Sequence, residues 1–248
     1  MEIIYILWLR QIKRYYRSKA RIIGSLGQPL LFMVAFGFGF GPIYQKAGEG
    51  NYLEFLVPGV IAMSILFSAV FSGLEIIWDR QFGFLKEMLV APVSRLKIMI
   101  GRSLGGATVA VIQGLVVLVL SFLIGFHIID WWMLSAAVVV MFLIAFLFTL
   151  FGTAVASLMK DVQGFQLIIN LLIMPLLFLS GAFFPLDSLP RAIQAPMMAN
   201  PLAYGVDALR GTLVGLHQFS LAADFTILGT IIILLLVISS YLFSKIQA

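Results

Sequence analysis

Long, continuous apolar runs dominate this chain of 248 residues, and they restrict its fold more than any other feature. Several runs reach the length of about 20 residues that a helix needs to cross the hydrocarbon core of a bilayer. Only 11% of the residues are charged, whereas a soluble domain carries roughly a quarter. The runs lack the alternating pattern of strands in a membrane β-barrel. The sequence therefore predicts an all-α membrane protein.

We expect residues 1–248 to form a single transmembrane domain with six spanning helices. The 16 Lys and Arg residues divide unequally between the two sides of such a bundle. Lys46, Arg191 and Arg210 fall on one side, and all the others fall on the side of the two termini. Basic residues concentrate on the cytoplasmic side of membrane proteins, so we predict a multi-pass protein of the cell membrane with both termini cytoplasmic. The predicted spans are 22–41, 55–78, 100–125, 132–158, 165–185 and 223–244.

Residues 1–21 have the pattern of an amphipathic helix that lies in the membrane interface. Aromatic and aliphatic residues recur at helical spacing, and basic residues occupy the other face, as expected for contact with lipid and anionic headgroups. A secretory signal peptide is disfavoured because no A-x-A-like cleavage site follows. The apolar face has Tyr5, Trp8, Leu9, Ile12 and Tyr16, and the basic face has Arg10, Lys13, Arg14 and Arg17.

The segment between the fifth and sixth spans is long, rather apolar and rich in proline. Non-helical backbone at membrane depth is tolerated only where protein or a water-filled cavity shelters it. Residues 182–222 are therefore predicted to form short re-entrant or surface-lying helices that cap the outer side of the bundle. Asp207 and Arg210, three residues apart, are expected to pair and stabilise this outer cap.

Residues 79–95 form a charged island between two apolar runs, too long and too helix-prone for a simple connector. We expect an amphipathic helix of two to three turns that ends before Pro92, because proline disfavours helix at the preceding residue. Its mixture of both charge signs favours docking of a partner protein. The alternative is a helix that merely rests on lipid. Candidate contact residues are Arg80, Phe82, Leu85, Lys86, Glu87 and Met88.

Catalytic and metal-binding patterns are missing from the sequence. The chain has no cysteine, and His127 and His217 lack the spacing of metal ligands. No G-x-x-x-x-G-K-[ST] phosphate loop occurs. The pattern G-x-S-x-G occurs at 101–105, but it lies inside a long apolar run and not between a strand and a helix, as a nucleophile elbow requires. We therefore expect a protein that is not an enzyme and binds no cofactor, metal or nucleic acid directly.

A charge inside a span is a pointer to ion-coupled transport, because burying it in hydrocarbon is costly. Glu75, near the cytoplasmic end of the second span, is the only charge that we expect inside a span. It is either a gating carboxylate that pairs with a basic interfacial residue or an acid whose head reaches water. Asn170, Pro175 and Ser180 of the fifth span are further candidates for a gate or path.

Three separated motifs resemble one known family. The run D-R-x-F-G-F-L-K-E-M-L-x-A-P-V-S-R at 79–95 is similar to the cytoplasmic coupling region of permease subunits of type-2 ABC exporters. These permeases serve daunorubicin-resistance-like, nodulation-factor and polysaccharide export systems. The segments S-G-A-F-F-P-L at 180–186 with N-P-L-A-Y-G-V-D-A-L-R at 200–210, and Y-L-E-F-L-V-P-G at 52–59, also resemble this family.

The resemblance implies a six-span permease with residues 1–21 as a connecting helix. It implies two permease copies, as a homodimer or related heterodimer, and two copies of a separate ATP-binding-cassette ATPase that docks on the 79–95 helix. ATP would act only through that subunit. The expected function is export of a hydrophobic or amphipathic substrate, such as a drug, lipid or lipid-linked glycan. The alternative is an ion-coupled secondary transporter or channel, which would need buried charges and an inverted repeat.

Overall fold

The computed structural model describes residues 2–46, 51–90, 93–185 and 191–246, and within these ranges it is a helical bundle without strands. Parts of two predicted segments, at 91–92 and 186–190, lie outside the described residues. The helices are α1 (Glu2–Arg17), α2 (Lys19–Lys46), α3 (Tyr52–Ser72), α4 (Leu74–Gln81), α5 (Phe84–Val90), α6 (Arg95–Phe122), η1 (Trp131–Met133), α7 (Leu134–Leu158), α8 (Val162–Phe178), α9 (Arg191–Met198), α10 (Pro201–Val214) and α11 (Leu221–Ser244).

Five helical stretches of the described chain are long and apolar enough to cross a membrane, and each overlaps one of the predicted spans. The predicted fifth span, 165–185, contains α8, which has only 17 residues. At a rise of 1.5 Å per residue α8 is about 25 Å long, less than the hydrocarbon thickness of about 30 Å. The helix ends at Phe178, and Gly181 soon after it adopts φ 71°, which is not a right-handed helical conformation. The sixth span therefore stays a prediction.

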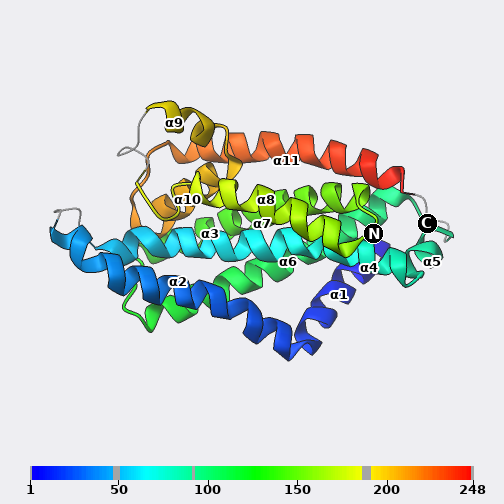
Figure 1. Ribbon diagram of the computed structural model, residues 1–248, viewed down its shortest axis with the longest axis horizontal. Coiled ribbons are helices and arrows are strands. Elements are labelled where there is room, and N and C mark those ends of the chain that lie inside the picture. The colour runs from blue at the N-terminus through cyan, green and yellow to red at the C-terminus, as the bar shows by residue number, and fades with distance from the viewer. Residues whose placement is uncertain (1, 47–50, 91–92, 186–190, 247–248) are drawn as a thin grey trace.

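The two termini lie at the same end of the bundle, together with α1, α4 and α5 (Figure 1). We call this end the basic end. The opposite end carries α9 and is called the cap end (Figure 1). There the connection between α6 and α7 joins α10, because the backbone N–H of Ile129 donates to the carbonyl of Leu213 at 3.1 Å.

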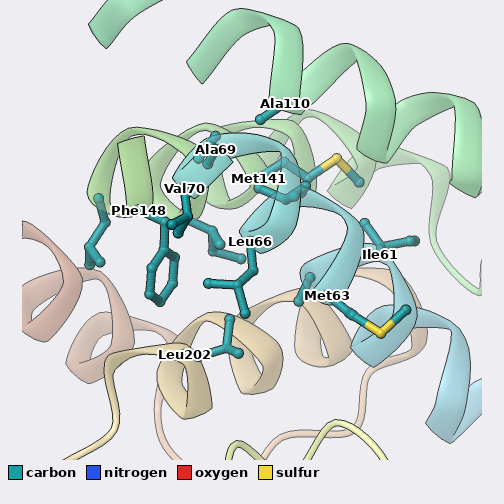
Figure 2. Packing of buried hydrophobic residues seen from close by; sticks show 14 of the residues in the cluster. Ile61, Met63, Leu66, Ala69, Val70, Ala110, Met141, Phe148 and Leu202 are labelled. Atoms are coloured by element: carbon teal, nitrogen blue, oxygen red, sulfur yellow. The ribbon is translucent and has the colours of Figure 1, made fainter. Parts of the chain in front are cut away.

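Helix α3 forms the centre of the bundle and packs against α2, α6, α7 and α10. Leu66 and Val70 of α3 are fully buried. Figure 2 shows them among Ala110 of α6, Phe148 of α7 and Leu202 of α10. A sequence that is apolar on all sides, such as that of α3, is what complete burial in protein and lipid requires.

Helix α1 is confirmed by the structure, but its apolar face does not simply meet lipid. Tyr5 and Tyr16 are exposed at 58% and 80%. Trp8, predicted on the same lipid-facing side, instead donates from Nε1 to the hydroxyl of Thr108 on α6 at 3.0 Å. Because α1 packs along α6, it is part of the bundle. Its position in the membrane interface stays a prediction.

The predicted continuous helix in the 79–95 segment is wrong in one respect, because the chain is broken at Phe82 and Gly83. Helix α4 ends at Gln81, and α5 begins at Phe84. Gly83 adopts φ 81°, a left-handed conformation that glycine reaches without steric cost. Helix α5 ends at Val90, before Pro92, as expected. The island thus contains a tight turn followed by a separate two-turn helix.

Candidate functional site

A cluster of charged side chains joins three helices at the basic end. Asp79 of α4 is 4% exposed and accepts a hydrogen bond from Nη1 of Arg102 on α6 at 2.5 Å. Its other oxygen accepts one from Nη2 of Arg10 on α1 at 3.2 Å. A buried carboxylate needs such partners, because an unpaired charge in a low-dielectric interior is costly. Asp79 therefore ties α4 to both α1 and α6.

Glu75 and Arg14 add a second ion pair to this cluster, with 3.6 Å between Nη1 and Oε2. The Arg14 guanidinium also lies 5.7 Å from the ring centroid of Trp78. Glu75 is only 3% exposed, so the interpretation as an acid reaching water is wrong and pairing with a basic interfacial residue is confirmed. We call Arg10, Arg14, Glu75, Asp79 and Arg102 the ionic cluster.

The expectation that Glu75 is the only charge inside a span is also wrong. Arg102 lies within the predicted third span, and its side chain is 5% exposed. Asp224, in the first turn of α11, is fully buried as well. Arg10 and Arg14, predicted to face anionic headgroups, turn toward the acids of α4 instead. The ionic cluster was missed because its members come from three segments, although an arginine within an apolar run was a signal for it.

The six predicted docking residues, on and just before α5, fall into an exposed set and a buried or partly buried set. Phe82 is 73% exposed, and Lys86 and Glu87 are also exposed. Leu85 is completely buried and packs into the main core. Met88 is partly buried, and its sulfur lies 3.6 Å from Nη1 of Arg10.

The sixth predicted docking residue, Arg80, is partly buried and bonds within the chain. Its Nη1 donates to the carbonyl of Met159, at the end of α7, at 2.9 Å. The surface available to a partner is therefore formed by the turn at Phe82 and by the outer side of α5. Arg80, Leu85 and Met88 hold that surface in place.

The structure does not bring the four predicted gate or path residues together. Asn170 and Pro175 lie on an exposed side of α8. Glu75 belongs to the ionic cluster at the basic end. Ser180 is buried at the end of α8, where its hydroxyl donates to the carbonyl of Leu177 at 2.6 Å. Whether any of them lines a path stays a prediction.

Arg210 of α10 connects the motifs at 52–59, 180–186 and 200–210. Its guanidinium donates to the carbonyl of Phe55 at 3.3 Å from Nη2, and to the carbonyl of Gly181 at 2.9 Å. It also lies 3.9 Å from the ring centroid of Phe55. Burial lowers the pKa of the Arg210 guanidinium to about 10, which leaves it charged at neutral pH. Arg210 thus holds α3, α10 and the turn after α8 together.

Further contacts join these motifs to one another and to α8. The hydroxyl of Tyr52 donates to the carbonyl of Phe183 at 3.1 Å. The side-chain amide of Asn200 donates to the carbonyl of Leu176 at 2.6 Å. A Cβ atom added to Gly59 would lie 2.2 Å from the carbonyl oxygen of Ala182, so glycine is needed where the turn crosses α3.

The predicted pair of Asp207 and Arg210 is not formed. The Asp207 carboxylate accepts hydrogen bonds from the backbone N–H groups of Gln218 and Phe219, at 2.9 Å each. It therefore fixes the connection from α10 to α11, while Arg210 reaches α3. Both residues do stabilise the cap end, as expected, but through different partners.

Comparison with known proteins places the chain in a family. Residues 2–214 match the model of the ABC-2 type transporter. The protein ycf38 of Cyanophora paradoxa is 30% identical over 84% of this chain and 72% of its own length. Nodulation protein J of Rhizobium leguminosarum bv. viciae is 30% identical, over 84% and 82% respectively. The inner membrane transport permease YadH of Escherichia coli K12 is 26% identical, over 92% and 89%.

The chain belongs to the ABC-2 type transporter family, because the family model covers most of its length. The helical bundle, with several apolar helices of spanning length, is that of a multi-pass membrane protein. This membership favours a transport permease over the ion-coupled transporter or channel that the sequence left as an alternative. Buried charges are present, but the ionic cluster lies at one end of the bundle.

Proposed function

We propose that this chain is the membrane-spanning permease subunit of an ATP-driven exporter, which moves a hydrophobic or amphipathic substrate out of the cytoplasm. A drug, a lipid or a lipid-linked glycan would fit this description. The sequence contains no phosphate loop of its own, so ATP hydrolysis would belong to a separate ATPase subunit. The observation that carries the proposal is the exposed surface of α5 at the basic end. The inward side chains of Arg80, Leu85 and Met88 hold this surface in place.

The distribution of basic residues supports a cytoplasmic basic end. Lys and Arg are concentrated in α1, in α4 and α5, and at the start of α6. By the positive-inside rule this end would face the cytoplasm, which would also place both termini there. The cap end, with α9 and α10, would then lie on the outer side, where these short helices would act as re-entrant elements at the exit of the path.

The α5 surface has the composition of a protein contact. It combines the exposed ring of Phe82 with the opposite charges of Lys86 and Glu87. A helix that binds only anionic lipid would be basic, whereas mixed charges give specificity toward a protein partner. Gly83 has no heavy atom near its virtual Cβ position, which leaves room for an ATPase surface to approach the turn.

The ionic cluster supports a route for mechanical coupling. Helix α4 continues α3 beyond Gly73, and Asp79 of α4 binds both Arg10 of α1 and Arg102 of α6. A displacement of α5 by the ATPase would therefore move α1, α3 and α6 together. ATP binding would bias the bundle toward an outward-open arrangement, and hydrolysis would reset it.

The exposed side of α8 supports a second permease copy. Leu167 and Leu171 are exposed at 73% and 74%, and Asn170 lies on this side as well. A side-chain amide facing hydrocarbon is unfavourable, so we expect this side to meet another copy or a path between two copies. The complete exporter would then contain two permease copies and two ATPase copies.

Co-purification tests the docking surface. The tagged permease would be expressed with its candidate ATP-binding-cassette subunit, as wild type and as Phe82→Asp and Glu87→Arg. Both variants should lose most of the bound ATPase and its permease-stimulated turnover, because they place a charge at the contact or reverse one. The matched control is Leu216→Asp, also on an exposed apolar residue (51%) but at the cap end.

Two results would contradict the proposal. If Phe82→Asp and Glu87→Arg retain both the ATPase and its stimulated turnover, α5 is not the docking surface. If reconstituted permease transports solute on an ion gradient with no ATPase present, the exporter function itself is wrong.

A further inference from the structure

A cavity lies between α2, α3 and α6, apart from the ionic cluster and from the exposed side of α8. It has a volume of about 240 Å³ and is partly open. Its polar lining consists of Ser25 and Gln28 of α2, Ser64 and Ser68 of α3, and Gln113 of α6. None of the described residues that line it carries a charge. Five hydroxyl and amide side chains in one cavity within three apolar helices require an explanation, because polar groups in spans normally serve a site or a helix contact.

Helix contacts account for only part of this lining. Gln113 is 4% exposed, and its amide donates to the carbonyl of Ser25 at 3.0 Å, which joins α6 to α2. Ser64 is 2% exposed, and its hydroxyl oxygen has no hydrogen-bond partner among the described residues. A buried hydroxyl without a partner costs about 1–3 kcal/mol. Water or a ligand in the cavity would supply the missing partner after a small rotation of the side chain.

Two aromatic rings form the apolar part of the wall. Phe67 and Phe71 of α3 are partly buried and stack with their planes 6° apart and their centroids 6.3 Å apart. The faces of such rings favour contact with apolar or weakly positive C–H groups. The wall thus combines neutral hydrogen-bonding groups with flat apolar surface.

The position of the cavity suits the head of a membrane molecule. Ser64 lies in the middle of the helical stretch Tyr52–Gln81, so the cavity is at membrane depth. Helix α2, which forms one side, is mostly unburied, since only 11% of its most apolar stretch lies inside the bundle. An acyl chain could therefore lie along the exposed side of α2 while its head occupies the cavity.

The volume limits what enters. It is below the range of about 300–1,000 Å³ that is usual for whole drug-sized ligands. At about 30 Å³ per water molecule it would hold about eight waters, which corresponds to a small head group.

From these observations we infer that the α2–α3–α6 cavity binds the uncharged, hydroxyl-bearing head of an amphipathic membrane molecule. Gln28, Ser64 and Gln113 would form hydrogen bonds to the head, and the rings of Phe67 and Phe71 would cover its apolar side. An anionic head is disfavoured because the described lining offers no cation. This inference deepens the proposed function, since an exporter must take up its substrate from such a place.

Site-specific alkylation tests the site without the ATPase, so a failure of ATP-driven export would leave the result valid. The natural chain has no cysteine, and a single Ser68→Cys exchange therefore gives a unique reporter. The matched control is Ile233→Cys, on an apolar, 66% exposed position of α11. Each protein is reconstituted in lipid nanodiscs and treated with N-ethylmaleimide, alone or with monooleoylglycerol or oleoyl lysophosphatidic acid.

We expect Ser68→Cys to react at least about tenfold faster than Ile233→Cys, because a hydrated cavity allows the thiolate to form. Monooleoylglycerol at twice its dissociation constant should slow the reaction about threefold, by mass action. The anionic lipid, with the same acyl chain, should not protect. Adding Gln28→Leu, at an exposed position of α2, should reduce the protection.

Equal alkylation rates at the two cysteines would show that the cavity is dry and would overturn the inference. Equal protection by both lipids would show that the acyl chain alone is bound, which also overturns it. If monooleoylglycerol still protects the introduced cysteine in both the Gln28→Leu and the Gln113→Leu variant, the amide side chains do not recognise the head.

Discussion

Asp79 and Arg102 form an ion pair in which each side chain is 5% exposed, with 2.5 Å between Oδ2 and Nη1. The pair connects α4, next to the exposed turn at Phe82, with the spanning helix α6. Arg10 of α1, at 3.2 Å from the same carboxylate, is 40% exposed and completes the connection. One carboxylate thus links the candidate docking surface to two helices of the bundle.

Removing either partner of this pair should destabilise the protein. Arg102→Met leaves a buried carboxylate with only Arg10, and a broken buried pair costs about 3–5 kcal/mol. Because Arg10 still compensates, we expect a loss of about 3 kcal/mol. The measurement is unfolding of the purified protein in detergent, and Arg17→Met, at an exposed position of α1, is the control.

The double variant Asp79→Leu with Arg102→Met should lose less than the sum of the two single losses, because it leaves no buried charge without a partner. Arg10 can then turn to water. Strictly additive losses would show that the two side chains do not depend on each other.

Gly59→Ala should destabilise the cap end. The added Cβ would meet the backbone of Ala182, with 2.2 Å to its carbonyl oxygen, and backbone cannot yield as a flexible side chain does. Overpacking of this kind costs about 1–3 kcal/mol. Thermal unfolding gives the comparison with Gly39→Ala, where nothing lies within 4 Å of the new Cβ. That control should be neutral or stabilising by up to about 1 kcal/mol, because alanine favours helix. Equal melting temperatures for the two variants would contradict the contact.

Arg210→Lys should weaken the cap end although it keeps the charge. Lysine cannot reproduce the planar fork that reaches the carbonyls of Phe55 and Gly181. Losing one charge-assisted hydrogen bond costs about 1.5–3 kcal/mol. Thermal unfolding is again the measurement, with Arg17→Lys at an exposed position as the matched exchange. A melting temperature unchanged in Arg210→Lys would mean that any cation suffices there.

Leu171→Cys should report the proposed second permease copy. Because the chain has no cysteine, a short bis-maleimide can link only the introduced residues. Leu171 lies on the exposed side of α8, and we expect a covalent dimer in native membranes. Ile233→Cys on α11 has comparable exposure and should give little product. A dimer formed only by the α11 variant would place the second copy elsewhere.

The sequence by itself determined the class of the protein and the gathering of its basic residues at one end of the bundle. Apolar runs of spanning length, few charges and an unequal division of basic residues require no knowledge of contacts, because hydrophobicity and charge act locally along the chain. The helix at Glu2–Arg17 and the end of α5 before Pro92 could also be predicted, because both depend on neighbouring residues in the sequence. The family resemblance rested on linear motifs, and the family comparison confirms it.

Only the tertiary structure decided which of these residues meet. Arg102 lies within a predicted apolar span, and it becomes the buried partner of Asp79 because α4 and α6 both pack against α7. Arg210 was assigned to its neighbour Asp207, but it reaches Phe55 and Gly181 because α10 lies against α3 and the turn after α8. Such choices depend on the approach of helices distant in sequence, where a buried polar group must take whichever partner the packing brings within reach.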